Sequence, residues 1–216
     1  MKLFTEEAQD VKMLTESVKG QKKLYIEGVF CQAEVKNRNG RVYPLQTLNN
    51  AINYYIENFV KQNRAVGELG HSATPTIVYD RVSHKITSLV REGNNFRGKA
   101  LILNTPMGNI VRNLHDEGVV FGVSSRAVGS LRATNEGVNI VGDDLMFSTV
   151  ADIVHDPSCT SAFVEGIMEG KEWYYDVTKK EWLLEDTKKK INKLVESRQF
   201  NEERKLQLFN EFINSI

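Results

Sequence analysis

From Leu24 to Val154 the chain is a succession of short apolar segments separated by turn-forming residues, and this pattern predicts strands more often than helices. Gly28 interrupts the first segment. Asn39-Gly40 favours a tight hairpin turn, because both residues tolerate a positive φ. We therefore expect a core made mainly of strands. The expected strands are 24–30, 82–91, 96–103, 119–129, 137–141 and 145–154.

Two segments within this range have helical periodicity instead. Pro44 suits the first turn of a helix, and the apolar residues after it recur at three- and four-residue spacing. This apolar stripe consists of Leu45, Leu48, Ile52, Tyr55, Ile56 and Phe59. Thr105 and Pro106 are suitable N-cap and first-turn residues for a shorter helix that ends near Gly118. We expect the first helix to pack on a sheet.

The two ends of the chain differ in composition from its middle. Residues 1–20 are polar, and we interpret them as a mobile or helical leader that is a candidate for removal. Residues 177–216 are rich in lysine and glutamate and are too short for a core of their own, so we expect a helical tail. The expected organisation is a leader at 1–20, one domain at 21–176 and a tail at 177–216.

Composition excludes several classes of protein. The 28 Lys and Arg residues balance the 28 Asp and Glu residues, which argues against a nucleic-acid binder. The two cysteines, Cys31 and Cys159, are far apart, and no Cys/His cluster has zinc spacing, so we expect neither a disulfide scaffold nor a metal centre. No apolar run approaches the about 18–20 residues of a membrane span, and no signal peptide is evident, so we expect a cytoplasmic protein.

The segment 118–130 is the most informative of the expected strands, because it carries two adjacent serines. Successive side chains of a strand point to opposite faces. Ser125 shares its face with apolar neighbours, which is typical of a core. Ser124 shares its face with Gly122 and Arg126, which is a suitable pattern for a cleft wall. If one serine is a nucleophile, the alternation favours Ser124; otherwise both are strand residues beside a bulge.

Candidate partners of a serine nucleophile lie in two other segments. His71 follows a glycine-flanked strand end, where a side chain can project into a cleft, whereas His84 and His115 are expected at the surface. Asp152 lies in an otherwise mostly apolar stretch, and a buried carboxylate needs a partner. That partner is either a histidine N–H, as in a catalytic triad, or an arginine in a structural ion pair. His155 is the alternative to Asp152 for the third catalytic role.

Three motifs resemble those of a known family. They are Val35-Lys36-Asn37-Arg38-Asn39-Gly40-Arg41-Val42-Tyr43-Pro44, Gly67-Glu68-Leu69-Gly70-His71 and Gly122-Val123-Ser124-Ser125-Arg126-Ala127-Val128-Gly129-Ser130. In this order they are similar to the motifs of the prohead (capsid-maturation) core proteases of T-even-type tailed bacteriophages, a family that is similar to the herpesvirus assemblin serine proteases. The resemblance runs from about Leu24 to Ser158.

The resemblance implies a serine endopeptidase of α+β class, in which a small closed, mostly antiparallel β-barrel is flanked by helices. By motif position, Ser124 is the nucleophile, His71 the general base and Asp152 the third member, a position at which assemblins use a second histidine. We expect backbone N–H groups near Ser125 and Arg126 to bind the oxyanion, with the Arg126 side chain as an additional candidate. No cofactor and no metal are expected.

The resemblance also implies a place and substrates. The protein is expected inside the assembling prohead, in the host cytoplasm, where it cleaves scaffold or core proteins and capsid proteins, with self-association as a further expectation. Cleavage is expected after Glu in Leu/Ile-x-Glu sequences. The chain itself has such sequences, which makes Glu16, Glu169 and Glu196 candidates for self-cleavage. The alternative is a catalytically inactive core or scaffold protein with the same fold.

Overall fold

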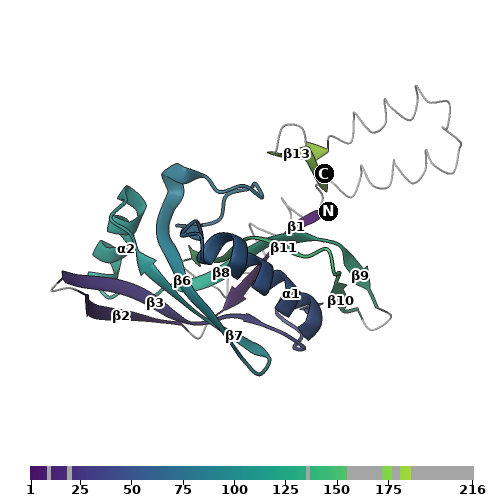
Figure 1. Cartoon of the computed structure of the whole chain (residues 1–216), viewed down its shortest axis with the longest axis horizontal. Coiled ribbons are helices and arrows are strands. Elements are labelled where there is room, and N and C mark those ends of the chain that lie inside the picture. Colours follow the sequence, from purple (N-terminus) through teal and green to yellow (C-terminus); the bar gives the residue numbers. More distant parts are fainter. Residues whose placement is uncertain (9–10, 19–20, 135–136, 155–171, 177–180, 186–216) are drawn as a thin grey trace, which may run out of the picture.

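The computed structural model describes residues 1–8, 11–18, 21–134, 137–154, 172–176 and 181–185 (Figure 1). Within these ranges strands predominate, and there are two α-helices. The strands form two five-stranded sheets and one three-stranded sheet, with mostly antiparallel pairing. In each sheet the strand order ends in an edge strand on both sides, so the closed β-barrel that the resemblance implies is not found among the described residues.

The first sheet contains the strand with the two serines. In spatial order it consists of β11 (Met146–Val154), β8 (Gly122–Gly129), β1 (Lys2–Ala8), β12 (Glu172–Asp176) and β13 (Glu181–Glu185). Every pair in this sheet is antiparallel. β8 is therefore an interior strand, with β11 on one side and β1 on the other. All of its residues are buried.

The second sheet is also antiparallel and meets the first at one edge. In spatial order it consists of β2 (Val11–Val18), β3 (Gln21–Gln32), β7 (Asn95–Ile102), β6 (Val82–Glu92) and β5 (Val66–Glu68). The hairpin predicted between β6 and β7 is confirmed. Just beyond β5, Leu69 forms a parallel bridge with Ile153 of β11. This bridge joins the two sheets and brings the segment after β5 beside the first sheet.

The two α-helices occur where the sequence predicts them. α1 (Leu45–Tyr55) is continued by the π-helical turn η1 (Ile56–Val60), and α2 (Pro106–Asp116) has the expected N-cap, with Thr105 Oγ1 accepting a hydrogen bond from the Gly108 N–H at 3.1 Å. The apolar stripe of α1 is buried in the core. Tyr55 packs edge-on against Phe147 of β11, with ring centroids 6.4 Å apart, so α1 packs on a sheet as predicted.

The third sheet is small and follows the predicted turn. In spatial order it consists of β4 (Arg41–Val42), β10 (Asn139–Val141) and β9 (Leu131–Ala133). The turn itself is present, with a φ of +71° at Gly40. It is not the turn of a hairpin, because β4 pairs in parallel with β10 rather than with β3. A separate 3₁₀ turn, η2 (Tyr79–Arg81), precedes β6.

The N-terminal residues form strands rather than the mobile or helical segment that their composition predicts. β1 pairs with β8 over its whole length, from Lys2–Gly129 to Ala8–Val123. Leu3 and Phe4 are fully buried. β2 is an edge strand with one solvated face, so it requires few apolar residues. A polar segment can therefore belong to the sheets.

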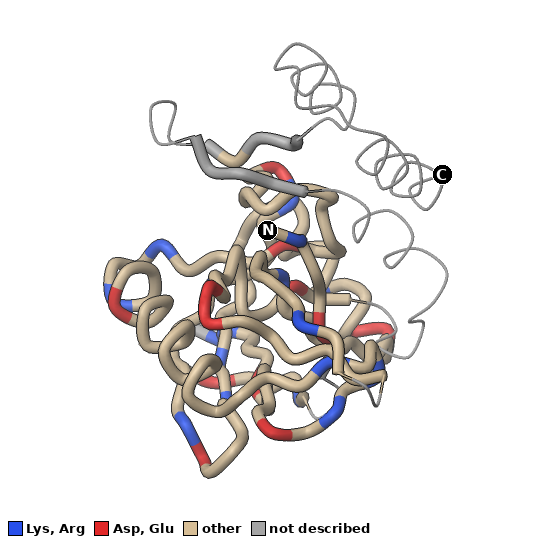
Figure 2. Tube along the Cα trace, turned by 90° about the vertical axis from the view of Figure 1, so that its right-hand side faces the viewer, with Lys and Arg blue, Asp and Glu red and all other residues tan. Residues whose placement is uncertain are grey.

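Only part of the expected C-terminal tail is described. Residues 181–185 form strand β13, which pairs with β12, so the expected helix is wrong for these residues. The rest of 177–216 lies outside the described residues. No helix in the described part is long and apolar enough to cross a membrane. Basic and acidic residues are interspersed along the described trace (Figure 2).

Candidate active site

The pairing of β8 with β11 places Ser124 beside Asp152. The two residues are direct partners in the antiparallel ladder, and residues directly opposite each other project to the same face. The register shifts between Thr149 and Asp152, which marks a β-bulge in β11. Bulges redirect side chains and often occur next to active sites. Ser124 and Asp152 therefore share one face of the first sheet.

His71 reaches the same place from the edge of the second sheet. The Gly70 N–H donates to the Ile153 carbonyl at 2.8 Å, and Gly70 has a φ of +72°, which glycine adopts without strain. The next residue, His71, then has its Nδ1 at 2.9 Å from Asp152 Oδ2. An ionised carboxylate can only accept, so Nδ1 carries the hydrogen and Nε2 is left as an acceptor.

The Asp152 carboxylate is fully buried and has three donors. His71 Nδ1 and Arg126 Nε approach Oδ2 at 2.9 and 3.1 Å. The backbone N–H of Glu68 donates to Oδ1 at 2.7 Å. The sequence left a histidine and an arginine open as alternative partners of this acid, and the structure contains both. These hydrogen bonds compensate the loss of water around a buried charge.

Arg126 ties β8 to the loop that follows His71. Its guanidinium has no exposed surface, and its Nη2 donates to Glu68 Oε1 at 2.8 Å. Its Nη1 donates to the loop, with Ser72 Oγ and the carbonyl oxygens of Ser72, Thr74 and Thr76 as acceptors. In this conformation the side chain binds buried acids and the loop, and it has no surface from which to reach a substrate oxyanion.

Glu68 is a second buried acid of the site, and it is not among the residues singled out from the sequence. Its Oε1 accepts hydrogen bonds from Arg126 Nη2 and from the Val78 N–H, both at 2.8 Å, and from Ser72 Oγ at 3.2 Å. Its Oε2 lies 3.7 Å from Arg81 Nε. The signal was present in the sequence: an acid inside a short apolar run, which is the argument that identified Asp152.

The Ser124 hydroxyl is at the site but is not bonded to its expected base. Ser124 is fully buried, and its Oγ has no hydrogen-bond partner within the described residues. A buried hydroxyl without a partner costs about 1–3 kcal/mol. The structure thus brings Ser124, His71 and Asp152 to one site, with a hydrogen bond between His71 and Asp152 and none between Ser124 and His71.

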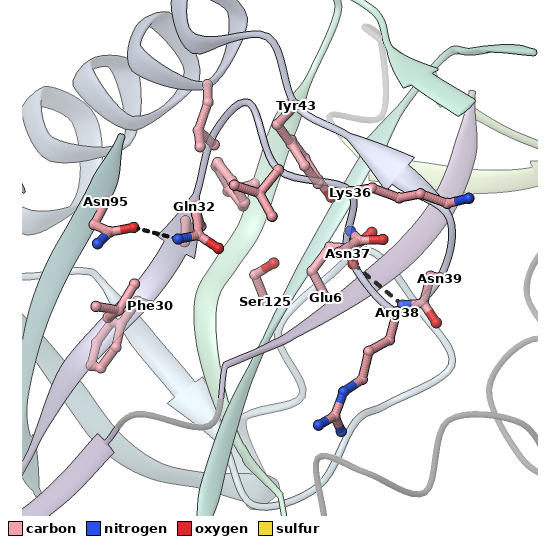
Figure 3. A pocket seen from close by; sticks show the side chains of 15 residues that line it. Glu6, Phe30, Gln32, Lys36, Asn37, Arg38, Asn39, Tyr43, Asn95 and Ser125 are labelled. Atoms are coloured by element: carbon pink, nitrogen blue, oxygen red, sulfur yellow. Dashed lines mark hydrogen bonds between the residues drawn. The ribbon is translucent and has the colours of Figure 1, made fainter. Parts of the chain in front are cut away.

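Ser125 lies on the opposite face of β8 and lines a separate pocket (Figure 3). This pocket has a volume of about 400 Å³. Its lining includes the apolar side chains of Phe30, Leu48 and Phe147. The neighbours of Ser125 on its own face, Val123 and Ala127, belong to the hydrophobic core as predicted. The pocket also lies on this face, whereas the sequence favoured a cleft on the face of Ser124, which is fully buried.

The turn motif beside this pocket holds an acid from the N-terminal strand. The Glu6 carboxylate accepts a hydrogen bond from Arg41 Nη1 at 2.8 Å. It also accepts from Asn39 Nδ2 at 3.3 Å and from Asn37 Nδ2, and these three side chains lie together in Figure 3. Burial raises the pKa of Glu6, and the charge of Arg41 offsets part of that rise. The motif therefore anchors β1, which is the neighbour of the serine-bearing strand.

The remaining sequence candidates have different outcomes. His84 is fully buried, so its expected surface position is wrong: its Nε2 bonds to the Ala151 carbonyl at 2.9 Å, and burial lowers its pKa. Glu16 lies in β2, where its carboxylate pairs with Lys99. His155, Glu169 and Glu196 lie outside the described residues. No group of three or more His, Cys, Asp or Glu residues that could hold a metal ion is present in the described part.

Known proteins resemble this chain over most of its length. The model of a family described as "Prohead core protein serine protease" matches residues 5–172. The chain is 38% identical over 144 residues to the prohead core protein protease of Enterobacteria phage T4. This match covers 65% of this chain and 68% of that protein. A solved structure of the bacteriophage T4 capsid assembly protease matches with a TM-score of 0.68 and 33% identity, over 72% of this chain and 98% of that one. A likeness to the herpesvirus assemblins stays a prediction.

Proposed function

The chain belongs to the prohead core protein serine protease family, and from this membership we propose that Ser124, His71 and Asp152 form its catalytic triad. The family gives the chain a protease role in phage head assembly, inside the prohead that forms in the host cell. One observation carries the proposal for the triad. The His71 ring is hydrogen-bonded to Asp152, and Asp152 is the ladder partner of Ser124.

In the proposed mechanism His71 Nε2 is the general base. It takes the proton from Ser124 Oγ as Oγ attacks the scissile carbonyl, and Asp152 stabilises the imidazolium that forms. The same proton then passes from Nε2 to the leaving amine, which gives an acyl-enzyme. Water attacks the acyl group with Nε2 again as base, and the proton returns to Ser124 Oγ as the acid product leaves.

Backbone N–H groups at Ser125 and Arg126 are the proposed oxyanion donors. The pairing of β8 with β11 is irregular opposite Ser125, because the register shifts between Thr149 and Asp152. Such irregularities often occur next to active sites. One such donor contributes about 3 kcal/mol to transition-state stabilisation. We assign the Arg126 side chain a positioning role instead, since it holds Asp152 and the loop after His71.

Hydrolysis by this triad requires a rearrangement. Ser124 has no exposed surface here, so a substrate carbonyl reaches its Oγ only after the covering groups move. Catalytic hydrogen bonds are often long in ligand-free enzymes and shorten when substrate binds. We propose that substrate binding uncovers Ser124 and brings Oγ within reach of His71 Nε2.

The proposed substrates are scaffold or core proteins and capsid proteins, cut after Glu in Leu/Ile-x-Glu sequences. Among the Leu/Ile-x-Glu sequences of the chain, those ending at Glu16, Glu169 and Glu196 remain candidates for self-cleavage. Glu16 lies in a strand that pairs with β3 through eight registered residues. A protease needs its substrate segment free of such pairing, so we propose that Glu16 is cut only when β2 detaches.

Covalent labelling tests the proposed nucleophile. A diphenyl phosphonate reagent built on a Leu-x-Glu peptide binds as a substrate does and carries the reactive group itself, so it is expected to label wild-type protein on Ser124, as located by peptide mass spectrometry. Ser124→Ala is expected to take up none, whereas Ser125→Ala, which retains the backbone N–H, is labelled. Labelling on Ser125, or equal labelling of wild type and Ser124→Ala, would overturn the assignment.

A second candidate function is a catalytically inactive core or scaffold protein with the same fold. The observation in its favour is the buried Ser124 hydroxyl without a bond to His71. The same labelling experiment separates the two functions, because an inactive relative leaves wild-type Ser124 unlabelled while the protein remains folded.

A further inference from the structure

Glu68 and Asp152 are two buried acids that share one arginine. Neither side chain has exposed surface, and Arg126 has none either. Arg126 Nη2 lies 2.8 Å from Glu68 Oε1, and Arg126 Nε lies 3.1 Å from Asp152 Oδ2. The Glu68 backbone also donates to Asp152 Oδ1 at 2.7 Å. One positive and two negative buried side chains, Arg126, Glu68 and Asp152, therefore lie in one cluster, and its aspartate is hydrogen-bonded to His71.

An arginine in this position opposes the function of the aspartate. Arg126 Nε and His71 Nδ1 approach the same oxygen of Asp152. A guanidinium this close cancels much of the negative charge that would stabilise an imidazolium on His71. Because these groups are buried, water and salt screen their interaction less than at a surface. A second negative charge is needed to restore the balance.

Glu68 provides that charge at the far side of the guanidinium. With both acids ionised, two carboxylates and one guanidinium give the buried cluster a formal charge of −1. Arg81 is a second cation near Glu68, at 3.7 Å, but its side chain is 43% exposed and therefore screened. His84, on the neighbouring strand β6, is a third group near both acids, and burial lowers its pKa. It adds no positive charge at neutral pH.

We propose that Glu68 is a positioning residue whose negative charge balances Arg126, so that the charge of Asp152 remains available to His71. The inference rests on the proposed triad. Glu68 also orients the loop after His71, because its Oε1 accepts from Ser72 Oγ and from the Val78 N–H. A glutamine at this position keeps an acceptor oxygen of the same reach and removes the charge, so it separates the two contributions.

The titration of the His71 ring is the direct readout, and it does not require activity. We propose to measure it by NMR in Ser124→Ala protein, with the His71 signal assigned by its loss in His71→Gln. Glu68→Gln is expected to lower the midpoint of this titration by about 1 pH unit, since one nearby charge typically moves a midpoint by about 1–3 units. Asp80→Asn is the matched control: it removes one negative charge from an exposed residue of η2, and the expected shift is under about 0.3 unit.

A double variant distinguishes charge balance from a structural defect. Glu68→Gln combined with Arg126→Gln removes one charge of each sign and leaves the cluster at −1. We expect its midpoint to return to within about 0.3 unit of the parent, although it alters more contacts than Glu68→Gln alone. A merely structural role for Glu68 predicts that the double variant departs from the parent at least as far as the single one.

The outcomes are decisive in each case. An unchanged midpoint in folded Glu68→Gln, an equal shift in Asp80→Asn, or a double variant that stays shifted would overturn the inference. Should Glu68→Gln fail to fold, Glu68→Asp replaces it: the charge is retained, so a midpoint more than about 0.3 unit from the parent would contradict charge balance. Absence of hydrolysis in the wild type would overturn the proposed function and leave this titration unaffected, so the two failures are distinguishable.

Discussion

Gly67 is the position at which one methyl group should disturb both the fold and the site. It is the ladder partner of His84 in the β5–β6 pair, and it precedes Glu68. A Cβ at this position would lie 2.2 Å from His84 Nε2 and 2.3 Å from the Ala151 carbonyl oxygen. These two atoms are hydrogen-bonded to each other at 2.9 Å in the buried interface between the sheets. The methyl group of alanine would therefore separate them.

The cost of Gly67→Ala has two parts. Forcing extra atoms into a packed core costs about 1–3 kcal/mol. Leaving the buried His84 N–H without its acceptor costs a further about 1–3 kcal/mol. We therefore expect the free energy of unfolding to fall by about 2–6 kcal/mol, a large fraction of the about 5–15 kcal/mol of a typical domain. Because Ala151 precedes Asp152, we also expect proteolytic activity to fall.

Urea unfolding at pH 7.5 measures this cost. Gly93→Ala is the matched control: Gly93 has a φ of +64° and no atom near its added Cβ, so only the backbone strain of about 1–2 kcal/mol applies. His84→Ala in the Gly67→Ala background removes the nearest clashing atom. The double variant should therefore be more stable than the sum of the single effects predicts, by at least about 1 kcal/mol. Additive effects, or a Gly67→Ala protein as stable as Gly93→Ala, would refute this reasoning.

Three further changes test the site, the buried histidine and the N-terminal strand. Asp152→Asn should lower kcat by about 10⁴-fold in a peptide assay of folded protein, since an amide no longer favours the Nδ1–H tautomer; a drop below tenfold would contradict this role. The pKa of His84 is lowered below 6.5, so the unfolded chain binds that proton more readily, and stability should be complete above about pH 6.5 and fall below it by up to about 1.4 kcal/mol per pH unit. Urea unfolding measured across this pH range should show a smaller loss of stability with falling pH in His84→Gln than in wild type. An identical loss would refute the assignment of this pH dependence to His84. Deletion of residues 1–8 removes Leu3 and Phe4 from the core and should lower the free energy of unfolding by about 3–6 kcal/mol, as measured by urea unfolding. An equally stable truncated protein would contradict the pairing of β1 with β8.

Local signals in the sequence were sufficient for most elements between 45 and 154. α1 and α2 begin where proline and a threonine cap indicate, and the β6–β7 hairpin forms at its predicted turn. These features depend on residues close together in the chain. β1 could not be found in this way, because its partner β8 is more than a hundred residues away and its polar residues contact the turn motif. The closed barrel was inferred from a resemblance and is not found among the described residues.

The site was predictable to a similar extent. The alternation of side chains along a strand placed Ser124 and Ser125 on opposite faces. The cost of burying the Asp152 carboxylate indicated a histidine or an arginine partner, and both are present. Glu68 was missed although the same cost applies to it. His84 was misplaced because its neighbours in the sequence are charged, whereas its environment is formed by β5 and β11. Environments assembled from distant strands are not visible in a local window.

The central claim is that Ser124, rather than its neighbour, is the nucleophile of a prohead protease. The most direct measurement is kcat/KM on a Leu-x-Glu peptide for wild type, Ser124→Ala and Ser125→Ala, each shown to be folded. The expected result is a loss of at least about 1,000-fold in Ser124→Ala and of no more than about tenfold in Ser125→Ala, which retains its backbone N–H. A Ser124→Ala protein that hydrolyses the peptide as fast as wild type would contradict the claim.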